Sequence, residues 1–364
     1  MRRFFNILGV LFAVHLSCSY GQVINIDIDA RQNHELQLTD IAENVTSVVF
    51  EIHPDYKFGS ITEFVWANPY CFLHVQTWQG PRCISDNILQ YTTSGKFVRS
   101  IGLKGGNNYL RNITCDTINH KLYLSKNDTL LVYDFDGKLM HKHGSFAGSS
   151  SYFLHENFIW AQYMALSDDR TTVNYTFSRF DPRNMSEQKI YLFNDKDGVI
   201  DGRMAIGSSA TYSTFKNDLY VSFGIDNLIH QMQKQTLIPA FKINITPESP
   251  DIHNPKSSAF HDRIMPGFRG FIGSYLFINY AIEGKRKLYI YDTKTKKGYN
   301  FSHDDTLNNQ GIRDNIYGSG HITLSKLNRS GYFYYIRNAG ALKEMPKGVT
   351  NKSQPVVFIA KIKE

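Results

Sequence analysis

The sequence predicts an all-β protein, a six-bladed β-propeller whose blades are four-stranded antiparallel sheets. Short alternating strands and turns recur along the chain at intervals of roughly 40 to 60 residues, which is typical of propeller blades. Helical periodicity over about ten residues is absent, which disfavours α/β folds. A strand-like run near the N-terminus has no blade of its own and predicts how the ring closes.

Hairpins are the clearest repeats. Residues 88–102 run in apolar alternation to a turn at Gly95 and out again, and residues 130–144 repeat this pattern around Gly137. In both turns glycine is predicted to supply a positive φ. Looser copies occupy residues 176–184, 228–236 and 288–296. The residues at equivalent places before these turns are Tyr91, Tyr133, Phe180, Gln231 and Tyr291.

A run of β-forming residues precedes each hairpin. These runs cover residues 70–75, 121–125, 157–161, 218–222 and 275–279, and a sixth run at 331–336 precedes the terminal run 356–362. Each unit therefore predicts a meander of about four strands, and six units fit the chain.

The last unit shows only three clear strands before the C-terminus. Residues 45–52 form a strand-like run that can complete it. Such pairing of the two chain ends removes exposed sheet edges. We therefore predict a leader at residues 1–21 and one propeller domain at 22–364, ordered from about residue 44.

The N-terminus has the features of an export signal. Two arginines precede an apolar run that ends at Leu16, and Ser19-Tyr20-Gly21 offers small residues for cleavage before Gln22. The run is too short to span a bilayer. We predict an exported protein, periplasmic, extracellular or at the cell surface, without a transmembrane segment in the mature chain. A second processing alternative stays open, in which Cys18 carries a lipid anchor.

Three cysteines remain after this cleavage: Cys71, Cys83 and Cys115. Cys71 and Cys83 flank a turn between predicted paired strands, so a disulfide between them is one alternative and two buried thiols are the other. Neither Cys-x-x-Cys nor His-x-x-x-His spacing occurs, which disfavours structural zinc. We predict no metal and no cofactor.

Composition and charge exclude several classes of protein. The aromatic content of 14% indicates a folded chain, and a mean hydropathy of −0.34 excludes a polytopic membrane protein. The formal net charge is +7, but the lysine-rich stretch Lys-Thr-Lys-Lys at residues 294–297 falls at a predicted hairpin tip. A nucleic-acid surface needs a clustered basic stripe, so we expect no nucleic-acid partner. We expect a monomer.

These repeats resemble the secreted six-bladed β-propeller proteins of Bacteroidota, which are similar in form to NHL-repeat propellers. The resemblance spans nearly the whole mature chain and rests on residues 50–52, 87–102, 119–124, 133–138 and 355–359. Relatives continue after the Ile-Gly pair with a Gly-Pro-Glu-Tyr-like loop, whereas residues 104–109 here lack the proline and the glutamate. The resemblance implies the fold and supplies no catalytic residue.

The predicted ligand face is the channel mouth, where each outer strand connects to the next inner strand. Residues 193–208, 246–270 and 302–320 form long connections, and long loops on a rigid scaffold tend to carry function. Trp78, in a polar stretch, is a candidate for stacking on a sugar ring. The other candidate ligand-binding residues are Arg203, His261, Arg263, Arg269, Arg313 and His321. The plainer alternative is a set of unrelated solvated side chains, and we predict no catalytic residue.

The leading hypothesis is an exported, non-enzymatic binding or scaffold propeller that recognises a glycan, peptide or protein at the channel mouth. The alternative is a lyase or hydrolase that acts on a polysaccharide or lactone through channel-mouth residues. Three or more His, Asp or Glu side chains converging at metal-bonding distance would favour the enzyme.

Overall fold

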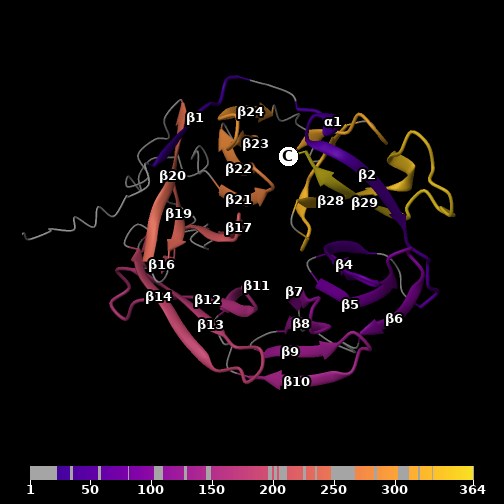
Figure 1. Cartoon of the computed structure of the whole chain (residues 1–364), viewed down its shortest axis with the longest axis horizontal. Coiled ribbons are helices and arrows are strands. Elements are labelled where there is room, and N and C mark those ends of the chain that lie inside the picture. Colours follow the sequence, from indigo (N-terminus) through magenta and orange to yellow (C-terminus); the bar gives the residue numbers. More distant parts are fainter. Residues whose placement is uncertain are drawn as a thin grey trace, which may run out of the picture.

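The protein forms a ring of six sheets (Figure 1). The computed structural model describes residues 23–32, 36–55, 59–80, 82–101, 110–126, 129–144, 149–195, 199–200, 203–204, 211–223, 227–233, 236–246, 267–282, 285–301, 311–318, 320–329 and 331–363. Each of the six sheets in these residues contains a four-stranded antiparallel meander, so the predicted all-β six-bladed propeller is confirmed.

The first three blades follow one another along the chain, each from its inner to its outer strand. Blade 1 contains β3 (Ser60–Ala67), β4 (Tyr70–Gln79), β5 (Arg82–Thr92) and β6 (Phe97–Ile101). Blade 2 contains β7 (Leu110–Asp116), β8 (Lys121–Lys126), β9 (Thr129–Asp134) and β10 (Leu139–His143). Blade 3 contains β11 (Ser149–His155), β12 (Phe158–Leu166), β13 (Val173–Phe180) and β14 (Glu187–Asp195).

The remaining blades continue the same order. Blade 4 contains β17 (Thr211–Phe215), β18 (Asp218–Ser222), β19 (Leu228–Gln233) and β20 (Thr236–Thr246). Blade 5 contains β21 (Gly267–Ile272), β22 (Tyr275–Ile282), β23 (Lys285–Asp292) and β24 (Lys297–Phe301). Blade 6 contains β27 (Ser325–Lys326), β28 (Tyr332–Asn338), β29 (Pro355–Ile362) and β2 (Ala42–Val49).

Closure of the ring joins the two ends of the chain. Strand β2 pairs antiparallel with β29, with Val48 opposite Val357 and Thr46 opposite Ile359. The indigo β2 therefore lies beside the yellow C-terminal strands in Figure 1. The predicted completion of the last blade by the N-terminal run is confirmed.

One N-terminal strand was not predicted. Strand β1 (Ile24–Asp29) pairs in parallel with β20 and adds a fifth strand outside blade 4. Its Ile26 and Ile28 are buried while Asn25 and Asp27 are exposed, which is the alternation of a half-buried strand. The prediction that order begins at about residue 44 is therefore corrected: regular structure is present from Ile24, because this short alternating run pairs with the edge strand of blade 4.

The hydrophobic core is divided among the contacts between neighbouring blades. In the part of the chain that the structure describes, buried residues form six clusters, and each lies between two adjacent blades. The cluster between blades 6 and 1 contains Val48, Phe50, Phe64, Leu73 and Val357. Blade 6 thus packs against blade 1 in the same way as the other neighbouring blades pack together. Hydrophobic burial therefore continues around the whole ring.

The predicted hairpin turns are present, with one correction. Gly95 and Gly137 have φ values of 88° and 79°. Before each turn, the third strand places a buried residue opposite the second strand's start, as Tyr91 lies opposite Cys71. In blade 4 the equivalent residue is Met232, which lies opposite Leu219, so the prediction that Gln231 occupies this position is wrong. Only two residues separate Gln233 from its partner Thr236, so the tighter turn shifts the position by one.

Smaller elements fill the connections between blades. These are α1 (Leu38–Ile41), the 3₁₀ turn η2 (Ala339–Ala341), and two ribbons formed by β15 (Val199–Ile200) with β16 (Arg203–Met204) and by β25 (Ile312–Arg313) with β26 (His321–Ile322). A buried ion pair of 2.9 Å joins Arg337 Nε on β28 to Asp314 Oδ2 beside β25. Among the described residues, no helix is long and apolar enough to cross a membrane.

Candidate functional site: the central channel

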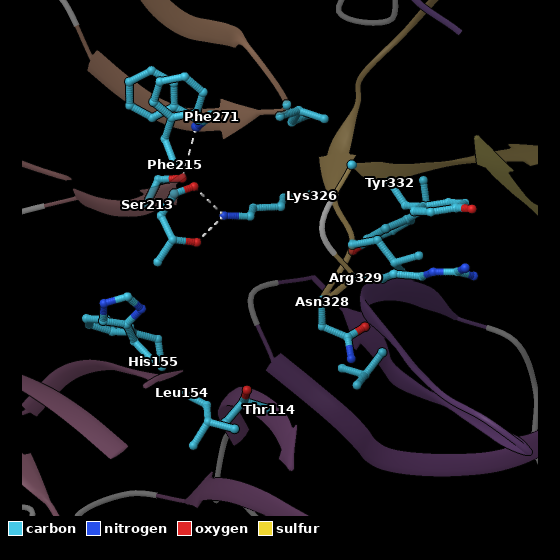
Figure 2. Close-up of a pocket in the computed structure, with 18 of the residues that line it drawn as sticks. Thr114, Leu154, His155, Ser213, Phe215, Phe271, Lys326, Asn328, Arg329 and Tyr332 are labelled. Carbon is cyan, nitrogen blue, oxygen red and sulfur yellow. Dashed lines mark hydrogen bonds between the residues drawn. The ribbon is translucent and has the colours of Figure 1, made fainter. Parts of the chain in front are cut away.

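A cavity of about 840 Å³ occupies the centre of the ring, and we call it the channel cavity. Residues from the inner strands of all six blades line it, namely from β3, β7, β11, β17, β21 and β27. Figure 2 shows several of these side chains around the open space. Its volume falls within the range of small-molecule and cofactor sites in proteins, about 300–1,000 Å³.

The channel cavity reaches one particular end of the channel. Its lining includes turns that join an inner strand to the second strand of the same blade, such as Lys216-Asn217, Gly273-Ser274 and Thr117-Ile118. Because successive strands alternate in direction, these turns lie opposite the outer-to-inner connections that the sequence predicted as the ligand face. The cavity in the described residues therefore extends toward the other end of the channel.

A β-bulge directs Arg269 toward the channel cavity. In β21, Phe268 pairs with Ile278 and Gly270 with Phe277, so Arg269 is the extra residue between them. Bulges re-aim side chains and are common beside functional sites. Its side chain is exposed, and desolvation by the surrounding protein lowers the pKa of the guanidinium. No carboxylate among the described residues pairs with it.

Lys326 crosses the lumen from β27 to β17. Its Nζ donates to the Thr214 carbonyl oxygen at 2.9 Å and to Thr214 Oγ1 at 2.6 Å (Figure 2). Its side chain is accessible from the lumen, yet the surrounding protein lowers the pKa of the ammonium to about 8. An ammonium has three donors, so one remains for a ligand in the lumen.

Positive charge predominates in the lining. Six Lys or Arg residues line the channel cavity, and none forms an ion pair in the described residues: Lys216, Arg269, Lys294, Lys326, Arg329 and Lys363. The acidic lining residues are Glu63 and Asp116. Asp116 is occupied by its own turn, because its carboxylate accepts from the backbone N–H groups of Ile118 and Asn119 at 2.9 Å each.

Glu63 is connected to a buried chain of polar side chains. Its Oε2 accepts from the Ile113 backbone N–H at 2.7 Å and lies 4.0 Å from His74 Nδ1. His74 is buried, with Nδ1 2.7 Å from Thr62 Oγ1 and Nε2 2.7 Å from Asp86 Oδ1. Burial raises the pKa of Glu63 to about 7, against the opposing effects of the Ile113 hydrogen bond and of His74.

Aromatic and amide side chains fix the shape of the wall. Phe215 stacks on Phe271 with ring centroids 4.8 Å apart, across the contact between blades 4 and 5. Asn328 joins blade 6 to blade 1 through two hydrogen bonds with the Trp66 backbone, of 2.7 and 2.8 Å. Such contacts hold the inner strands at fixed positions and keep the lumen open to a ligand.

Of the predicted ligand-binding residues whose side chains the structure describes, only Arg269 is found in the lining of the channel cavity. Trp78 is 47% exposed near the tip of the β4–β5 hairpin. Arg313 and His321 lie opposite each other on the β25–β26 ribbon. Arg203 lies in β16 without a described side chain, and His261 and Arg263 fall outside the described residues.

Cys71, Cys83 and Cys115 are free thiols in the structure, which therefore contains no Cys71–Cys83 disulfide. The two residues lie on paired strands but at different levels, Cys71 opposite Tyr91 and Cys83 opposite Trp78. Cys71 is buried and Cys83 only partly so. Among the described residues, no group of three His, Cys, Asp or Glu side chains could hold a metal ion.

Comparison with known proteins places the chain in a family. A family model described as a domain of unknown function, DUF4934, matches residues 22–364. The chain belongs to the DUF4934 family. A search of curated proteins found no match.

Solved structures match this DUF4934 chain over most of its length. A putative exported protein of Bacteroides fragilis matches with a TM-score of 0.65 and 14% identity, over 94% of this chain and all of that one. An acylaminoacyl peptidase of Pyrococcus horikoshii matches with a TM-score of 0.44 and 10% identity, over 80% of this chain and 46% of that one. The propeller domain of a Pyrococcus furiosus protease matches with a TM-score of 0.40 and 11% identity, over 79% and 78%.

Proposed function

We propose that this DUF4934 protein is an exported binding propeller that holds an oligosaccharide in its central channel. The observation that carries the proposal is the channel cavity of about 840 Å³, lined by the inner strands of all six blades. A rigid ring that leaves such a lumen at its axis offers a preformed site, and preformed sites bind without a large ordering cost.

Export rests on the N-terminal sequence. Two arginines, an apolar run and small residues precede Gln22, where the family match also begins. The similar Bacteroides fragilis protein carries the description of a putative exported protein. An exported binding protein meets extracellular glycans.

An oligosaccharide suits the wall better than a purely apolar ligand. Hydroxyl and amide groups suit sugar hydroxyls, and aromatic rings suit the C–H face of a sugar. The hydroxyl and amide side chains of the lining include Thr114, Asn157, Ser213, Thr214, Asn217 and Asn328, and the rings include Tyr152, Phe153, Tyr212, Phe215 and Tyr332.

The experiment is a glycan-array screen of the purified protein, with and without EDTA. The proposal predicts binding to a small set of related glycans that is unchanged by EDTA. A lumen variant must then lose the binding: replacing Thr214 by Trp would fill the space beside Lys326. Binding that survives this change, in a protein with unchanged circular dichroism, would place the glycan elsewhere and contradict the proposal.

A second function, polysaccharide lyase or hydrolase, is favoured by one observation. Glu63 lines the channel cavity with a pKa raised to about 7, and His74 and Asp86 lie behind it. A carboxyl group of this pKa suits a general acid or base. The test is the release of new sugar ends from any glycan that binds: Glu63→Gln should abolish the release and preserve binding. If no bound glycan releases new sugar ends, the enzymatic function is contradicted and only the binding function remains.

A further inference from the structure

Two cations of the channel cavity come from strands that contact the same stretch of β17. Lys326 donates twice to Thr214. The neighbouring residue, Ser213, accepts at Oγ from the Phe271 backbone N–H at 2.9 Å. A Cβ at Gly270 would lie 2.9 Å from Ser213 Oγ, so β21 touches β17 immediately beside Arg269. Blades 4, 5 and 6 therefore bring a lysine and an arginine to the same side of the lumen.

Neither cation is neutralised by the protein. No carboxylate of the described residues pairs with Lys326 or Arg269. Both side chains are accessible from the lumen, and desolvation by the surrounding protein lowers the pKa of both groups. Cations without a counter-charge in the wall of a cavity raise its positive potential and attract an anion. Cations with a perturbed pKa that gather in a cavity are typical of ligand sites.

The rest of the lining leaves this positive charge in place. The carboxylate of Asp116 is held by backbone N–H groups, and burial keeps Glu63 partly protonated near neutral pH. Lys216 and Arg329 lie over the rings of Phe215 and Tyr332, at 5.2 and 4.0 Å from their centroids. A negative ligand therefore finds donors at the wall and a positive potential around it.

Resting on the proposed function, we propose that the channel cavity is specific for an acidic oligosaccharide, whose carboxylate binds between the Lys326 ammonium and the Arg269 guanidinium. The guanidinium can donate two parallel hydrogen bonds to a carboxylate, and Lys326 donates the N–H that Thr214 leaves free. The sugar rings would extend along the aromatic part of the wall, where Phe215 and Tyr332 lie.

The test is calorimetric titration of the purified protein with tetragalacturonate, its methyl ester and tetraglutamate. The ester keeps the sugar rings but lacks the charge, and the peptide keeps the charge but lacks the rings. We expect the acid to bind at least about tenfold more tightly than either, and to weaken as salt is added. Lys326→Gln and Arg269→Gln should each weaken it about tenfold or more, because each removes a charged hydrogen bond.

The matched control is Lys138→Gln, which removes an exposed lysine from the β9–β10 turn and should change nothing. Lys326→Arg should keep most of the binding. Arg269→Gln should melt no lower than the wild type, because it removes an exposed cation that pairs with no carboxylate of the described residues, whereas a purely structural arginine would lower the melting temperature.

Each other result overturns the inference in a recognisable way. Equal affinity for acid and ester contradicts the anion site but leaves oligosaccharide binding intact. Equal affinity for tetraglutamate contradicts the choice of a sugar. If no probe binds while the array shows a neutral glycan, the anion site alone fails, and a silent array removes the proposed function as well.

Discussion

Glu63 combines exposure to a ligand with an environment that resists its charge. Burial raises the pKa of its carboxyl from 4.5 to about 7. The folded protein therefore holds this proton more tightly than the unfolded chain. The resulting stability is fully present below pH 4.5 and is lost as the pH rises through about 7.

Replacing Glu63 by Gln should remove this pH dependence. Gln still accepts from the Ile113 N–H and does not ionise. Relative to the variant, wild-type stability should fall by on the order of 2 kcal/mol between pH 4.5 and 7, discounted for the partial exposure of the carboxyl. Urea unfolding of both proteins across this range measures it. Parallel curves would show that Glu63 keeps an ordinary pKa.

The three cysteines should differ in reactivity. Cys71 and Cys115 are buried, and burial raises the pKa of both thiols, that of Cys115 to about 12. Cys83 is partly exposed. A maleimide should therefore label Cys83 first in the native protein. It should label all three cysteines after denaturation without a reducing agent. Protection of Cys71 and Cys83 in the denatured, unreduced chain would instead reveal a disulfide.

The sequence identifies only part of the site at this scale. Arg269 was a candidate because it falls within the long predicted connection 246–270, but the bulge that aims it depends on the pairing of Phe268 and Gly270 with β22. Lys326 lies in a two-residue strand, and its role depends on Thr214, 112 residues away. Nothing local in the sequence distinguishes this lysine from those on the surface.

Among the elements, the two glycine turns offer a matched test. Both glycines have positive φ, so alanine costs about 1 kcal/mol at either. A Cβ at Gly95 would also lie 2.1 Å from the Val49 carbonyl oxygen, whereas the nearest atom at Gly137 is 3.3 Å away on the flexible Arg99 side chain. Gly95→Ala should therefore cost about 3 kcal/mol or more. Equal losses in thermal unfolding would contradict the close approach of this turn to the end of β2.

Local patterns predict elements well where they are regular. The second strands and the outer hairpins alternate clearly, and the structure contains them all. The misses come from long-range pairing. Strand β1 depends on the free edge of β20, and the β25–β26 ribbon pairs only two residues on each side. The Gln231 position failed because turn length sets the register of a hairpin.

For the whole molecule, the two N-terminal strands should contribute unequally. A chain that starts at residue 36 lacks β1 and exposes the edge of β20, but keeps every blade four-stranded. A chain that starts at residue 51 also lacks β2, and the ring then cannot close through β29. The first should lose about 2–5 kcal/mol, mainly from the burial of Ile26 and Ile28, and still unfold cooperatively. The second should aggregate.

Urea unfolding and gel filtration of both chains check this expectation. The opposite result would contradict it: the chain from residue 51 would be monomeric and unfold cooperatively, while the chain from residue 36 would aggregate. Closure through β29 would then not hold the ring together.

The most direct measurement of the central claim is hydrogen–deuterium exchange with and without a bound acidic oligosaccharide. A ligand in the channel predicts slower exchange in the inner strands and their turns, at residues 211–217, 267–274 and 325–329. Slowing confined to the β4–β5 hairpin around Trp78 or to the outer strands, with these segments unchanged, would contradict it.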